Sequence, residues 1–210
     1  MADANLSTLI TNLAFNRTVT PPDVLALRRL IYSDGAIAPH EAEALIALDE
    51  AAAARCAEWD ELFVEALTDY VVRQQAPADY IDDAKADWLI ARLSADGRIK
   101  TDSELEALVH ILETATTSPA RLTAFVLGQV KAAVVSGEGP LLRGGRLEKG
   151  RISAGEVALL RRVLYAAGGD GNVAITRSEA EVLFDINDAC RGADNDPSWT
   201  DLFAKAWPPR

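Results

Sequence analysis

The chain has 210 residues, of which 49% are apolar and 25% charged, and its formal net charge is −11. These proportions are typical of a soluble globular protein with one large domain or two small ones. The acidic balance disfavours nucleic acids and anionic membranes as partners, because both are polyanions. Residues 1–5 carry no basic side chain, so the sequence predicts no signal peptide. No run of 18 apolar residues occurs, so it predicts no membrane span. We therefore expect a cytoplasmic protein.

The first part of the chain predicts a short amphipathic helix followed by three further helices. Apolar residues spaced by three and four positions over residues 6–13 form one face of the short helix. Two prolines in a first turn begin a helix over about residues 20–32. An Asp-Gly turn follows at residues 34–37, because its glycine permits the positive φ that a tight turn needs. Helical spacing then returns over residues 39–48 and 59–71.

The order of helix, turn and two helices recurs twice. The second copy has a helix around residues 88–93, a turn at 96–99, and helices over about 101–112 and from 119 onward. The third copy matches the first in three segments, and a repeat of this size is a whole supersecondary unit. The matched segments are Leu27–Tyr32 with Leu160–Tyr165, Glu41–Leu45 with Glu179–Leu183, and Trp59, Leu62, Phe63 and Ala66 with Trp199, Leu202, Phe203 and Ala206.

The sequence therefore predicts an all-α protein of about ten helices, in which three helical repeats pack into one compact body. The repeats span approximately residues 20–76, 78–136 and 152–207, within a single domain of residues 1–210. A glycine-rich and locally basic stretch at residues 137–150 is expected to be an exposed connector. We expect one buried aromatic residue to be equivalent in all copies, namely Phe63, Phe125 and Phe203.

Each repeat pairs an aspartate in its turn with a glutamate in the first turn of the next helix. We expect these residues to cap the turn and the helix, because they satisfy backbone N–H groups that lack helical partners. The alternative is a Ca²⁺ or Mg²⁺ site, since hard cations prefer carboxylate oxygens, and the chain would then be a divalent-cation binder or sensor. The pairs are Asp34 with Glu41, Asp96 with Glu104, and Asp170 with Glu179.

A calcium-binding loop of the EF-hand type also places a glycine before an isoleucine and ends on a glutamate. With Gly35 at the sixth position of such a loop, Leu30 and Tyr32 occupy positions where calcium requires oxygen ligands. With Gly97 at that position, Arg92 does so. These side chains cannot bind calcium, so the sequence disfavours a true EF-hand.

The residues needed for common catalytic sites are missing from the sequence. His40 and His110 are its two histidines, and they occupy non-equivalent places in their repeats. Zinc-binding, nucleophile-elbow and phosphate-loop motifs do not occur. Cys56 and Cys190 are expected to be free thiols. We therefore expect a protein that is not an enzyme and has no cofactor. An enzyme that acts through carboxylates alone is the third alternative, after an interaction protein and a cation binder.

The turn motif resembles that of a known helical family. In Ser33–Ile37 and again in Ala95–Ile99, a helix ends in Asp-Gly, the chain passes through an isoleucine, and a new helix begins near Glu41 or Glu104. This pattern resembles the TerB-like family, which includes the tellurite-resistance protein of that name and the N-terminal domain of a DnaJ-like co-chaperone. The resemblance covers mainly the turn and its flanking helices, and it implies an all-α fold with an interaction or stress-associated role.

These observations together predict a non-enzymatic interaction or scaffold protein of the bacterial cytoplasm. Its expected partner is another protein, and neither nucleic acid nor a membrane. Two pairs of arginines, Arg28 with Arg29 and Arg161 with Arg162, lie near the ends of the helices that precede the turns. We expect them to interact with the negative ends of those helices.

Overall fold

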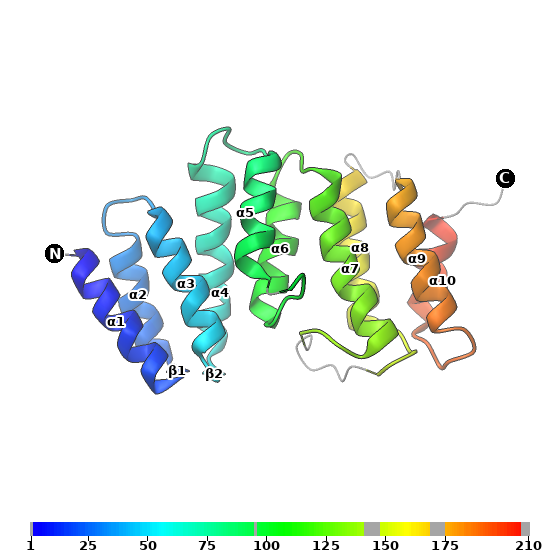
Figure 1. Cartoon of the computed structure of the whole chain (residues 1–210), viewed down its shortest axis with the longest axis horizontal. Coiled ribbons are helices and arrows are strands. Elements are labelled where there is room, and N and C mark those ends of the chain that lie inside the picture. Colours follow the sequence, from blue (N-terminus) through cyan, green and yellow to red (C-terminus); the bar gives the residue numbers. More distant parts are fainter. Residues whose placement is uncertain (1, 95, 141–147, 169–174, 207–210) are drawn as a thin grey trace. The chain divides into compact units, whose positions relative to one another are not determined.

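The structure, a computed structural model, describes residues 2–94, 96–140, 148–168 and 175–206 (Figure 1). Within these residues the chain forms ten α-helices, one short π-helix and one pair of two-residue strands, so the prediction of an all-α fold is confirmed. None of the described helices is both long and apolar enough to cross a bilayer. The chain divides into two compact units, Met1–Tyr80 and Ile81–Arg210, and a single domain stays a prediction.

The first unit contains the first predicted repeat together with the short N-terminal helix. Two of its helices begin at prolines, Pro21 and Pro39, as the sequence predicts. The π-helix and the strands were not predicted, because segments of two to six residues are too short to show a period. The elements are α1 (Ala2–Asn16), β1 (Thr18–Val19), α2 (Pro21–Ile31), α3 (Pro39–Ala51), β2 (Ala54–Arg55), α4 (Ala57–Thr68) and η1 (Asp69–Gln74).

The core of the first unit forms where α1 packs against α2 and α3, and where α2 and α3 pack against α4. The predicted face of α1 is confirmed, because Leu6, Ile10 and Leu13 are buried. Trp59 and Phe63 of α4 are fully buried, and each such aromatic side chain removes a large apolar area from water. The α1 helix thus covers the beginning of the first repeat.

The second unit contains the second and third predicted repeats. Within it, α7 packs against α5, α6, α8 and α9, while α8 also packs against α6 and α10. The second and third repeats are therefore joined by packing of α6 and α7 against α8 and α9 (Figure 1). The elements are α5 (Asp83–Leu93), α6 (Asp102–Thr114), α7 (Ala120–Ser136), α8 (Ala154–Gly168), α9 (Arg177–Ala189) and α10 (Pro197–Ala206).

The repeat is visible in the positions of residues within corresponding helices. The middle helices α3, α6 and α9 are each 13 residues long and have a glutamate as third residue. The seventh residue of the last helix is Phe63 in α4, Val126 in α7 and Phe203 in α10. Phe63 and Val126 are fully buried, whereas Phe125 and Phe203 are half-buried.

The predicted equivalence of Phe63, Phe125 and Phe203 is therefore wrong in two respects. The second repeat has one additional residue between its turn and its glutamate, so the position equivalent to Phe63 is Val126 and Phe125 points about 100° away around the helix. Phe203 does occupy the equivalent position. It is half-buried, however, whereas Phe63 is fully buried.

The described ends of the predicted connector are anchored to the fold. Gly137 ends α7 with a left-handed φ of +69°, and Pro140 is buried. The N–H of Gly150 donates a hydrogen bond of 2.7 Å to the carbonyl of Val134. Expecting the whole segment to be exposed was therefore wrong at Pro140, while residues 141–147 lie outside the described part of the chain.

Candidate functional site

The first Asp-Gly turn is held by hydrogen bonds within the first unit. Gly35 has a φ of +83°, as the turn requires, and Asp34 Oδ1 accepts a bond of 3.2 Å from the N–H of Ala36. The N–H of the buried Ile37 donates to Gln74 Oε1 at 2.7 Å. The turn is thus fixed to the end of η1 through Gln74.

The second Asp-Gly turn is held by a glutamine from a different position. Gln129 of α7 accepts a bond of 3.1 Å from the N–H of Ile99 and donates one of 2.9 Å to the carbonyl of Gly97. Gln129 is the tenth residue of α7, whereas Gln74 lies after the end of α4. The two glutamines are therefore not repeated in the sequence, and sequence comparison of the copies had no signal for them.

The predicted capping roles of the glutamates are confirmed. Glu41 accepts a bond of 2.8 Å from the N–H of Ala38. Glu104 accepts bonds of 3.0 Å from the N–H groups of Thr101 and Lys100, and the Thr101 hydroxyl accepts one of 3.1 Å in return.

The same reciprocal capping holds at the start of α9. Glu179 accepts a bond of 2.7 Å from the N–H of Thr176, and the Thr176 hydroxyl accepts one from the N–H of Glu179. Asp170, the proposed partner of Glu179, lies outside the described residues. Among the residues that are described, no three His, Cys, Asp or Glu side chains gather in a way that could hold a metal ion. The observed bonds therefore support capping as the role of these glutamates.

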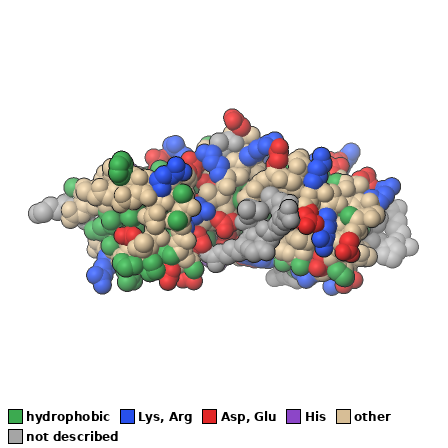
Figure 2. All heavy atoms as spheres, turned by 90° about the horizontal axis from the view of Figure 1, so that it is seen from below, with side chains coloured by type: hydrophobic (Ala, Val, Ile, Leu, Met, Phe, Trp, Pro, Cys, Tyr) green, Lys and Arg blue, Asp and Glu red, His purple; other side chains and the backbone are tan. Residues whose placement is uncertain are grey.

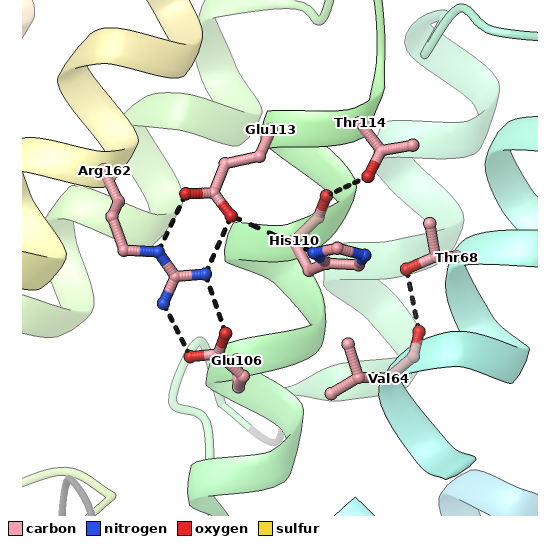
Figure 3. A network of polar contacts seen from close by, with 7 residues as sticks. All are labelled: Val64, Thr68, Glu106, His110, Glu113, Thr114 and Arg162. Carbon is pink, nitrogen blue, oxygen red and sulfur yellow. Dashed lines mark hydrogen bonds and ion pairs between the residues drawn. The ribbon is translucent and has the colours of Figure 1, made fainter. Parts of the chain in front are cut away.

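A cluster of charged side chains joins the second and third repeats inside the second unit (Figure 3). Arg162 of α8 points between Glu106 and Glu113, which lie two turns apart on α6. Its Nη1 and Nη2 donate to the two carboxylate oxygens of Glu106 at 2.8 and 2.7 Å. Its Nε and Nη2 donate to those of Glu113, both at 2.8 Å. One guanidinium group thus binds two carboxylates in the bidentate geometry that makes such pairs strong.

The electrostatics of the cluster follow from these contacts. The hydrogen bonds from Arg162 hold the pKa of Glu113 below its ordinary value, and the positive charge of Arg162 adds to this effect. Bonds to Glu113 and Glu106 raise the pKa of Arg162, which therefore stays charged. His110 lies beside the cluster, with its Nδ1 3.9 Å from Glu113 Oε2. The expectation that Arg162 acts on a helix end is wrong, because it bridges two helices.

The acidic pair that binds Arg162 recurs in the other middle helices. Glu106 and Glu113 are the fifth and twelfth residues of α6, and α9 has acidic residues at both positions. The same two positions of α3 are also acidic. In α9 Glu181 pairs with Arg177 of the same helix, and Asp188 pairs with Arg191, which follows the end of the helix. The acidic pairs are Glu43 with Glu50, Glu106 with Glu113, and Glu181 with Asp188.

The eighth residue of the middle helix shows how the third repeat differs. It is Ile46 in α3, Val109 in α6 and Phe184 in α9, with exposed fractions of 5%, 0% and 41%. Phe184 stacks edge-to-face on Phe203, with ring centroids 5.3 Å apart. Together they border a small apolar groove that is partly open to solvent. Its lining residues are Ile175, Ala180, Leu183, Phe184, Phe203 and Ala206.

The environment of the two cysteines does not activate their thiols. Burial raises the pKa of the Cys56 and Cys190 thiols above the ordinary value of 9.0, which is the reverse of an activated nucleophile. Both cysteines are free, as expected. His40 is exposed at the first turn of α3.

Comparison with known proteins yields no relative. The chain matches no family model, no curated protein and no solved structure.

Proposed function

We propose that this chain is a non-enzymatic interaction protein of TerB-like type in the bacterial cytoplasm, with a stress-associated role. We further propose that it binds a helix of a partner protein on α9 and α10. One observation carries the proposal. The face of α9 and α10 that borders the groove is half-exposed, while the corresponding face of the second repeat is covered by α8 of the third. In the second repeat a helix covers this face, whereas in the third repeat Phe184 is 41% exposed among the described residues.

The covered face shows what kind of helix fits. On α6 the contact surface combines the apolar Leu105 and Val109 with the acidic pair Glu106 and Glu113. On α9 the corresponding residues are Ala180, Phe184, Glu181 and Asp188. The two faces therefore share an acidic pair beside apolar residues, although the third repeat has a smaller residue at Ala180 and a larger, aromatic one at Phe184.

The partner helix is then defined by α8, which occupies this position on α6. Leu159 and Val163 of α8 are buried, and Arg162 lies beside them and binds both carboxylates. We expect a partner helix with an apolar stripe and one arginine at its edge. Such a helix buries its stripe in the groove, and the arginine gives specificity through its bidentate geometry.

A synthetic peptide with the sequence of residues 154–166 tests the proposal, because it carries the stripe and Arg162. We expect saturable binding of the labelled peptide to the full chain by fluorescence anisotropy. The variant Phe184→Asp should abolish binding, whereas Phe15→Asp, a matched change at an exposed phenylalanine of α1, should not. Equal binding by Phe184→Asp, or by a peptide of scrambled sequence, contradicts the proposal.

A further inference from the structure

In the first helix of the first repeat, the side that corresponds to the buried side of α8 is only partly covered, because Ala26 and Leu30 are half-buried where α8 has the buried Leu159 and Val163. Counted from the start of its helix, Arg29 of α2 is the ninth residue, as Arg162 is in α8, and the surrounding sequences are Leu27–Tyr32 and Leu160–Tyr165. Arg162 binds α6, whereas Arg29 is exposed and makes no ion pair with a described residue. The α2 helix therefore has an arginine at the position of Arg162, but this arginine makes no ion pair with another described helix.

The neighbours of the two helices explain this difference. The α8 helix packs against α7, α10 and α6, while α2 packs against α1 and α4. In packing, α1 contacts α2 and α3 as α7 contacts α8 and α9, and α4 contacts α2 as α10 contacts α8. The neighbour that α2 lacks within its unit therefore corresponds to α6. This neighbour is a middle helix with an acidic residue at its fifth and twelfth positions.

The α9 helix is such a middle helix. It presents Glu181 and Asp188 at those positions, with exposed side chains, and the groove beside Phe184 lies next to them. The side of α2 near Arg29 also carries Leu25, which is 59% exposed and lies one turn before Arg29. Hydrophobic side chains gather on the surface of the first unit, at the left of Figure 2. The two faces are thus complementary in charge, and each carries an exposed apolar side chain, Leu25 on α2 and Phe184 on α9.

We infer that the partner helix is α2 of a second copy of this chain. This inference rests on the proposed function, because it uses the same face of α9 and α10. Arg29 of one copy binds Glu181 and Asp188 of the next, as Arg162 binds Glu106 and Glu113, and Leu25 lies at the rim of the contact. The interface joins two different surfaces, so each copy binds two others and the assembly grows as a chain or closes into a ring.

Sedimentation velocity of the full chain at rising concentration tests this inference. We expect a weight-average mass that increases beyond that of a dimer. Arg29→Glu places an acidic residue against the acidic pair, and should weaken association about tenfold or more, as should Glu181→Arg combined with Asp188→Arg. Arg161→Glu is the matched control, because it makes the same charge change at an exposed arginine of α8 and should leave association unchanged.

Charge reversal on both surfaces makes the test decisive. A chain with Arg29→Glu, Glu181→Arg and Asp188→Arg together should associate again, because its two faces are once more complementary. A wild-type chain that stays monomeric at all concentrations overturns the inference, as does a triple variant that does not regain association. If the peptide of residues 154–166 binds to a chain that remains monomeric, the proposed function stands and self-association is excluded.

Discussion

The first and third repeats use one tryptophan position in two different ways. Trp59 is the third residue of α4, and its Nε1 donates a hydrogen bond of 2.7 Å to Asp49, a fully buried residue of α3 that also binds Arg55. Trp199 is the third residue of α10, where its Nε1 is buried without a hydrogen-bond partner among the described residues. The position equivalent to Asp49 is Asn187 in α9.

This difference shows that the copies share helix positions without sharing environments. In the first repeat Ile46, Phe63 and Trp59 are buried, and the indole N–H of Trp59 is hydrogen-bonded. In the third repeat Phe184 and Phe203 remain partly in water. A repeated residue therefore contributes to stability according to how much of its apolar surface is buried.

The largest expected effect compares the two equivalent phenylalanines. Phe63→Ala should lower the free energy of unfolding by about 3–5 kcal/mol, the range for a fully buried aromatic side chain. Phe203→Ala should cost less than half as much, because part of the Phe203 ring is already exposed to water in the folded chain. Urea unfolding followed by far-UV circular dichroism measures both. Equal losses would show that the third repeat is as well covered as the first.

The next effect concerns the cluster that joins the second and third repeats. Arg162→Met keeps the aliphatic stem and removes the bonds to Glu106 and Glu113, so it should cost about 1–2 kcal/mol after allowance for the partial exposure of all three side chains. Arg161→Met is the control, because Arg161 is exposed and is not part of this cluster.

The same cluster predicts a dependence on pH. Because Arg162 lowers the pKa of Glu113 in the folded chain, its contribution is present above the ordinary carboxyl pKa of 4.5 and is lost as the pH falls through the folded-state pKa. The difference in unfolding free energy between wild type and Arg162→Met should therefore shrink below about pH 4. A difference that stays constant from pH 7 to pH 3 would show that the bridge does not contribute through its charges.

The features that could be predicted from the sequence are hydrogen bonds between residues close together in the chain. The reciprocal caps at Thr101 with Glu104 and at Thr176 with Glu179 lie three residues apart, so their spacing alone predicts the hydrogen bonds.

What the sequence did not reveal depends on distant partners. Gln129 reaches its turn from 30 residues away, and Arg162 reaches Glu106 from 56 residues away. A helical pattern fixes which face a side chain occupies, but not which helix lies opposite. The shift at Phe125 arose from one additional residue in a turn, which is enough to rotate every later position of the repeat.

The smallest effect separates capping from cation binding at the turns. Thr101→Ala removes the acceptor of the Glu104 N–H, and should lower the free energy of unfolding by about 1 kcal/mol, within the range of about 0.5–2 kcal/mol for such caps. Thr176→Ala makes the same change in the third repeat and should have a similar effect. Thermal unfolding of both variants, with and without a chelator, provides the measurement.

A chelator distinguishes the two roles because a calcium site depends on the ion, which needs six to eight oxygen ligands. A cap consists only of hydrogen bonds between groups of the chain, so removing cations leaves it unchanged. Glu41 and Glu104 already accept backbone N–H groups, and Asp34 accepts one from its own turn. Binding a cation would have to replace or share these acceptors. We therefore expect the melting temperature to be the same with EDTA and with added calcium. A calcium-dependent rise that disappears in Glu179→Gln, but persists in Glu41→Gln, would place an ion at the third turn and make the chain a cation-binding protein.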